Sequence, residues 1–187
     1  MTPRLERKTT ALVVIDLQEK LLPAVLESER VVKATRLLLR AASVLRLPVL
    51  LTTQYKKGLG ATVGGIEELV PPEAPRIDKA SFSCFDDERF ASLLAASAPK
   101  AETLLVAGIE AHICVAGTVF GALRRGLAVQ VAADAVSSRK AIDLATGQRR
   151  MEEAGALVTT AEMAVYELLG RSDSAEFKAM LPYFKGE

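Results

Sequence analysis

Cys114 is the residue in this sequence whose position best suits a nucleophile. It follows an apolar segment at residues 103–107, which predicts a buried strand, and a sharp turn expected at Gly108. It then falls in the first turn of a predicted helix. Unpaired backbone N–H groups and the helix dipole favour an anion there, so we expect a lowered pKa for this thiol. The alternative is a small buried residue that only fills space between helix and sheet.

Asp16 and Lys79 occupy positions from which they could assist such a nucleophile. Asp16 ends an apolar run at residues 11–15, and Lys79 follows a short strand predicted at residues 76–78. If the first and fourth strands are neighbours, Asp16 and Cys114 meet where open α/β sheets bind ligands. A carboxylate can take a thiol proton, and an ammonium group favours both anions. Taken singly, Asp16 is explained as a turn cap and Lys79 as a solvated loop lysine.

The elements that would hold these residues alternate between strands and helices. Apolar runs predict six strands, at residues 11–15, 49–53, 76–78, 103–107, 127–132 and 156–159. Helical spacing predicts helices at residues 28–46, 86–96 and 144–154, one whose first turn contains Cys114, one ending near Leu169 and a short one at the C-terminal end. Ser83 or Asp86 is the expected cap of the second helix, and Thr159 with Glu162 forms an expected capping box. This alternation predicts a single domain over residues 1–187, with a doubly wound, mostly parallel, six-stranded sheet.

The segment at residues 54–78 breaks this regular pattern. Its glycines and prolines interrupt any helix or strand, and long irregular segments inside compact domains are usually functional or mobile. Tyr55, at the mouth of the second strand, could line a substrate pocket or anchor the loop. His112, two residues before Cys114, could touch the site or serve as a turn residue.

Composition argues against several classes of function. The 187 residues include 24 basic and 23 acidic side chains, a formal net charge of +1, and no basic stripe that predicts a nucleic-acid surface. No apolar run has the length of a membrane span, and the first residues lack the apolar region of a secretory signal. Two cysteines in such a chain favour a cytoplasmic location. His112 is the only histidine, so we expect no metal, and no nucleotide-binding motif predicts a cofactor.

Three separated segments resemble the signature segments of the isochorismatase-like cysteine hydrolases. They are Val14-Ile-Asp-Leu-Gln18, Lys79-Ala-Ser-Phe-Ser-Cys-Phe85 and Gly108-Ile-Glu-Ala-His-Ile-Cys-Val115. Residues 54–60, 133–139 and 159–163 resemble the subgroup called isochorismatase domain-containing proteins. The resemblance runs from the first strand to about Leu169 and implies a three-layer α/β/α, Rossmann-like fold.

The resemblance also implies a site. An Asp-Lys-Cys triad maps onto Asp16, Lys79 and Cys114, and the Ile109–Glu110 peptide bond is expected to be cis. The backbone N–H groups of Glu110 and Cys114 are the implied oxyanion hole. We assign Gln18, Tyr55 and Phe82 to substrate binding.

The expected activity is hydrolysis of an amide-type C–N bond in a small molecule through a thioester. Nicotinamidase-type relatives carry a metal-binding Asp-x-His…His motif after the second strand, where this chain reads Thr53-Gln-Tyr-Lys-Lys-Gly58. A vinyl ether hydrolase, with Asp16 as acid and Cys114 as a bystander, is one alternative. A catalytically silent oligomeric binding protein is another. Family members are commonly oligomeric, so the resemblance implies a homo-oligomer.

Overall fold

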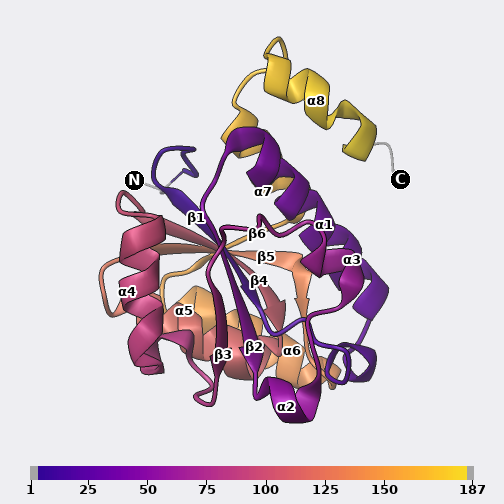
Figure 1. Cartoon of the computed structure of the whole chain (residues 1–187), viewed down its shortest axis with the longest axis vertical. Helices are drawn as coiled ribbons and strands as arrows, with labels where there is room; N and C mark the ends of the chain where they lie inside the picture. Colours follow the sequence, from indigo (N-terminus) through magenta and orange to yellow (C-terminus); the bar gives the residue numbers. More distant parts are fainter. Residues whose placement is uncertain (1–3, 185–187) are drawn as a thin grey trace.

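The structure, a computed structural model, describes residues 4–184 and has three layers, α/β/α (Figure 1). Six parallel strands form one sheet in the order β3-β2-β1-β4-β5-β6. The strands are β1 (Thr10–Ile15), β2 (Val49–Gln54), β3 (Arg76–Lys79), β4 (Thr103–Ile109), β5 (Ala128–Ser137) and β6 (Leu157–Thr159). The predicted fold class is confirmed, with a sheet that is parallel throughout.

Helices cover both faces of this sheet (Figure 1). One face carries α1 (Ser28–Leu45) and α7 (Ala161–Leu169), against which α8 (Ala175–Phe184) packs from outside, and the other carries α4 (Glu88–Ser97), α5 (Ala116–Leu123) and α6 (Ala141–Glu153). Shorter helical segments are η1 (Leu22–Ala24), α2 (Lys56–Leu59), α3 (Gly64–Glu67), η2 (Cys84–Asp86) and the π-helical turn η3 (Ala111–Val115). No helix among residues 4–184 is both long and apolar enough to cross a membrane.

The central strand β1 shows why the apolar runs are continuous. Every residue of β1 is buried. Leu12 and Val14 pack in the core under α1 and α7, whereas Val13 and Ile15 pack in the core under α4 and α5. Because side chains of a strand alternate between faces, a strand covered on both sides needs apolar residues at consecutive positions.

Two helix caps lie one residue or more from their predicted places. Asp87, not Ser83 or Asp86, caps α4, where its carboxylate accepts the N–H of Arg89 at 3.0 Å. Thr160, not Thr159, caps α7 by accepting the N–H of Met163 at 3.3 Å. In each case the cap has extended backbone, which turns its oxygen toward the first-turn amides. Thr159 is unavailable because it still belongs to β6.

The segment at residues 54–78 is more ordered than its composition indicates. It contains α2 and α3 and ends in β3. An isolated antiparallel bridge between Gln18 and Thr62 connects it to the chain that follows β1. The segment therefore packs over the carboxyl end of β1.

The strand order reverses between β1 and β4. These strands are neighbours, with Ile15 paired to Gly108. On its other side, Ile15 pairs with Thr52 of β2. The condition for Asp16 and Cys114 to meet is thus confirmed, and ligands of open α/β sheets bind at such a point.

Candidate active site

Asp16 is fixed immediately beyond β1. Its backbone N–H donates to the carbonyl oxygen of Thr52 at 3.1 Å, and its φ of 54° turns the chain out of the strand. The carboxylate is fully buried. Thr52 donates its hydroxyl to Oδ1 at 2.7 Å, and Lys79 donates from Nζ to Oδ2 at 2.7 Å. Both carboxylate oxygens are therefore held.

Lys79 is the last residue of β3 and is only 1% exposed. Besides Asp16, its ammonium donates to Oε1 of Gln54 at 2.7 Å. Burial works to lower the pKa of Lys79, but the neighbouring Asp16 carboxylate outweighs burial and raises this pKa above its usual value. A buried ammonium with a carboxylate partner stays charged, and removing either partner of such a pair costs about 3–5 kcal/mol.

Gly108 permits the close approach of β4 to β1 beside Asp16. Its φ is +129°, and a Cβ built on it would lie 2.1 Å from the carbonyl oxygen of Ile15. Only glycine fits this position, because a side chain would collide with strand backbone. The sharp turn predicted at Gly108 instead comes after Ile109, because Gly108 still pairs with Ile15 inside β4.

Cys114 lies in the π-helical turn η3, and α5 begins two residues later. Cys114 therefore lies in a helical turn, as predicted, but this turn is π-helical. The side chain is buried, with 6% exposure, and its sulfur lies 3.9 Å from Oε1 of Gln54. Single π turns are often found at functional sites.

The expected lowering of the thiol pKa was wrong. Burial raises the pKa of Cys114 to about 12, and the Asp16 carboxylate adds to this effect, while Lys79 opposes it without prevailing. Low dielectric and a nearby carboxylate both disfavour a thiolate. The resting site therefore pairs a protonated thiol with a carboxylate that can accept its proton.

The turn that carries Cys114 is anchored from two sides. The predicted cis bond between Ile109 and Glu110 is confirmed. The carbonyl of Glu110 accepts the amides of Ile113 at 3.0 Å and Val115 at 3.2 Å, which lie on either side of Cys114. The Glu110 carboxylate accepts the backbone N–H of Arg139 at 2.9 Å and its Nε at 3.0 Å.

His112 lies in the same turn and points to the end of β5. Its Nδ1 is 2.9 Å from the hydroxyl of Ser138. On its other side, Gly147 of α6 approaches so closely that a Cβ there would lie 2.9 Å from the Cα of His112. These contacts are those of a residue that packs the turn against β5 and α6.

The three residues assigned to substrate binding lie in different surroundings. Gln18 is buried, and its side chain bonds to backbone: it accepts the N–H of Gln54 at 2.7 Å and donates to the carbonyls of Gln54 and Gly60 at 3.1 and 2.8 Å. Tyr55 and Phe82 are 59% and 64% exposed. The Tyr55 ring lies against Gly58, which has room for no side chain there. Gln18 and Tyr55 thus both hold the loop after β2.

Sequence reasoning missed Gln54 and Thr52, which touch the triad directly. Both lie at the carboxyl end of β2, and Gln54 pairs with Lys79 in the sheet. The feature that could have identified them is their position on the strand next to β1, at the same edge of the sheet as Asp16. Glutamine and threonine are common at strand ends, so neither residue can be singled out before the pairing of the neighbouring strands is known.

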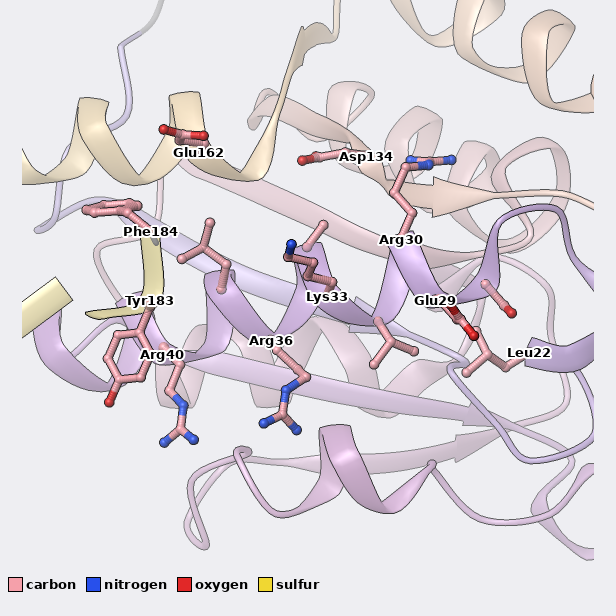
Figure 2. A pocket seen from close by; sticks show the side chains of 14 residues that line it. Leu22, Glu29, Arg30, Lys33, Arg36, Arg40, Asp134, Glu162, Tyr183 and Phe184 are labelled. Atoms are coloured by element: carbon pink, nitrogen blue, oxygen red, sulfur yellow. The ribbon is translucent and has the colours of Figure 1, made fainter. Parts of the chain in front are cut away.

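One cavity of the described chain lies away from Asp16, Lys79 and Cys114. It has a volume of about 690 Å³ and is lined mainly by α1 and α8, through Arg30, Lys33, Arg36, Arg40, Tyr183 and Phe184 (Figure 2). Three of its cations are engaged within the chain: Arg30 pairs with Glu27 at 3.1 Å, Arg36 pairs with Glu68 at 3.1 Å, and Arg40 lies 5.1 Å from the Tyr183 ring centre. Within residues 4–184, no group of three or more His, Cys, Asp or Glu side chains is arranged to hold a metal.

Comparison with known proteins identifies the family. Residues 10–163 match the isochorismatase domain. The chain belongs to the isochorismatase family. It is 36% identical over 177 residues to isochorismatase domain-containing protein 2 of Danio rerio, covering 94% of this chain and 86% of that protein.

Solved structures agree with this assignment. The MAR1 ribonuclease of Caenorhabditis elegans has a TM-score of 0.92 and 36% identity, covering 99% of this chain and 94% of that one. The YcaC gene product of Escherichia coli, described as an octameric hydrolase of unknown specificity, has a TM-score of 0.88 and 26% identity, covering 97% and 93%. The chain therefore has the hydrolase fold of the isochorismatase family.

Proposed function

We propose that this chain is a metal-independent cysteine hydrolase that cleaves an amide-type C–N bond in a small molecule. The observation that carries the proposal is the buried contact of Asp16, Lys79 and Cys114 at the point where the strand order reverses. A carboxylate, an ammonium group and a thiol in one buried crevice form a general base, a fixed counter-charge and a nucleophile. The chain also has no histidine in the loop after β2, where nicotinamidase-type relatives bind a metal.

The first half of the reaction forms a thioester. The Cys114 sulfur attacks the carbonyl carbon of the amide as its thiol proton passes to Asp16. The C–N bond then breaks, and Asp16 returns the proton to the leaving nitrogen. Lys79, which donates to Asp16 at 2.7 Å, stabilises the carboxylate whenever it is ionised.

The second half releases the acid. Water attacks the thioester carbon as Asp16 takes one of its protons, and the C–S bond then breaks as Asp16 passes this proton to the departing sulfur, which restores the thiol and the carboxylate. The products are a carboxylic acid and an amine or ammonia. The charge that develops on the carbonyl oxygen in both halves is received by the proposed oxyanion hole, the backbone N–H groups of Glu110 and Cys114.

The proposed substrate is a small molecule that enters beside Tyr55 and Phe82. These aromatic side chains are exposed on segments that directly follow Gln54 and Lys79. We also propose that the chain, as one hydrolase domain over residues 1–187, forms a homo-oligomer. A neighbour described as octameric and the exposed apolar side chains of α7, Met163 and Tyr166, support this.

A panel of small amides, assayed with the wild-type protein and Cys114→Ala, tests the proposal. We expect at least one amide to be hydrolysed by the wild type and turnover to fall by about a thousandfold or more in the variant. Cys84→Ala is the matched control, because Cys84 is also buried and should leave turnover near wild type. Full turnover by Cys114→Ala would contradict the nucleophile and favour acid chemistry by Asp16, as in a vinyl ether hydrolase.

A further inference from the structure

Gln54 touches two members of the triad and has no assigned role. We infer that Gln54 is a positioning residue of the proposed reaction, whose side-chain oxygen holds the Lys79 ammonium in place and receives the resting thiol hydrogen of Cys114. The inference rests on the proposed function. It is carried by two contacts of one atom: Oε1 lies 2.7 Å from Nζ of Lys79 and 3.9 Å from the sulfur of Cys114.

The orientation of the Gln54 amide is determined by its other end. Nε2 donates to the carbonyl oxygen of Ala80 at 2.8 Å, so Oε1 is the atom that faces Lys79 and Cys114. A carbonyl oxygen can only accept hydrogen bonds. It therefore suits an ammonium group and a protonated thiol and is a poor neighbour for a thiolate.

The backbone of Gln54 is held as firmly as its side chain. Gln18 accepts the Gln54 N–H at 2.7 Å and donates to the Gln54 carbonyl at 3.1 Å. The same Gln18 amide donates to Gly60 at 2.8 Å. Gln18 is buried, and this pair of bonds places Gln54 at the crevice with little freedom to move. This assigns Gln18 a supporting role behind Gln54.

The charges around the sulfur define what Gln54 contributes. Cys114 is influenced by Asp16 from the end of β1, by Lys79 from β3 and by Cys84 from η2. Lys79 is the cation in that set, and its ammonium is shared between Asp16 and Gln54. With Gln54 neutral, Lys79 is held without adding a second negative charge beside the sulfur.

Alkylation of Cys114 by iodoacetamide tests this role without a known substrate. The S–C bond forms, iodide leaves, and the thiol proton passes to solvent, so the rate follows the thiolate fraction. Peptide mass spectrometry separates Cys114 from Cys84, and rates are recorded from pH 6 to pH 11 on the full chain.

Two substitutions of Gln54 should move this rate in opposite directions. Gln54→Met keeps the length but removes the acceptor, which frees Lys79 to face the sulfur, so we expect about tenfold faster alkylation at pH 8. Gln54→Glu keeps the shape but adds a negative charge, so we expect about tenfold slower alkylation. Gln148→Met, on α6, is the control and should leave the rate unchanged.

If Gln54 had only a structural role, the two substitutions would change the alkylation rate of Cys114 in the same direction or not at all. That result would overturn the inference. If Gln54→Met fails to fold, as judged by its melting temperature, the near-isosteric Gln54→Glu still decides. A Glu variant that alkylates as fast as wild type, or faster, would also overturn it. The proposed function fails separately, through full turnover by Cys114→Ala.

Discussion

Asp16 has two opposing effects on Cys114. Its negative charge raises the pKa of the thiol and so suppresses the thiolate, yet in the proposed reaction the same carboxylate is the base that takes the thiol proton. The two effects can be reconciled if the proton moves only as sulfur attacks a substrate. A cysteine protected in this way reacts slowly with general electrophiles near neutral pH, because little of it is thiolate.

Asp16→Asn should separate these effects. Without the carboxylate charge, the Lys79 ammonium is no longer opposed by Asp16 beside the sulfur, so we expect Cys114 to be alkylated by iodoacetamide at pH 8 at least about tenfold faster than in wild type. Amide turnover should be lost, because asparagine cannot accept the proton. Alkylation rates and turnover are measured on the same preparation, with the exposed Asp173→Asn as control. Slower alkylation with retained turnover would contradict the role of Asp16.

At the scale of residues, the sequence indicated where the candidate residues lie but not the ionisation of the thiol. Apolar runs placed Asp16 and Lys79 at strand ends and Cys114 just beyond one, whereas their grouping as a triad came from the resemblance to the family. The state of the thiol depends on how deeply η3 is buried and on the distance to Asp16, which only the fold determines. Gln54 was missed because its role depends on the register of β2 with β3.

At the scale of elements, the β1–β4 contact at Gly108 positions the site. A β-carbon at Gly108 would meet the backbone of Ile15, the residue that precedes Asp16. Strand backbone cannot move aside without disturbing the hydrogen bonds of both β1 and β4. The geometry of the site is therefore coupled to the packing of the central strands.

Gly108→Ala should destabilise the protein far more than Gly155→Ala. Both residues have positive φ, +129° and +104°, but no atom lies within 4 Å of a Cβ at Gly155. We expect the Gly155 variant to lose about 1–3 kcal/mol in free energy of unfolding, from backbone strain alone. The Gly108 variant should lose more than about 4 kcal/mol, because it adds a backbone collision. Urea unfolding measures both, and equal losses would show that the contact with Ile15 is unimportant.

Element boundaries were less predictable than element types. Strands and long helices were found because their apolar residues repeat with a clear period, whereas the caps at Asp87 and Thr160 depend on where the chain leaves extended backbone. The π turn at Ala111–Val115 has no apolar repeat of its own that distinguishes it from an α-helix. Its shape follows from contacts with β5 and α6 that are distant in sequence.

At the scale of the whole molecule, the sheet order brings buried ionisable groups from separate segments together. Lys79, Cys84 and Cys114 influence one another and lie between the sheet and the α4–α5 layer. Burial raises the pKa of Cys84 to about 11 and that of Cys114 to about 12, from an ordinary value of 9.0. Each thiol is therefore protonated in the folded chain at pH values where it ionises in the unfolded chain.

This difference predicts a loss of stability in alkali. A group whose pKa is raised by folding contributes to the free energy of unfolding. This contribution is fully present below the pKa of the unfolded state, here 9.0, and is lost as the pH rises toward the pKa of the folded state. The free energy of unfolding should thus fall between pH 9 and pH 12. Lys79, whose pKa is also raised, adds to the fall in the upper part of this range.

The double variant Cys84→Ala, Cys114→Ala should lose much of this pH dependence. Urea midpoints are measured at pH 8, 9, 10 and 10.5 for the variant and the wild type. The change of midpoint with pH is then compared between the two proteins, so that titrations common to both cancel. The variant should start less stable, since two buried side chains are shortened, and should then lose stability more gradually. Parallel slopes would mean that the thiols are already exposed or ionised in the folded chain, and the buried, protonated nucleophile described above would be wrong.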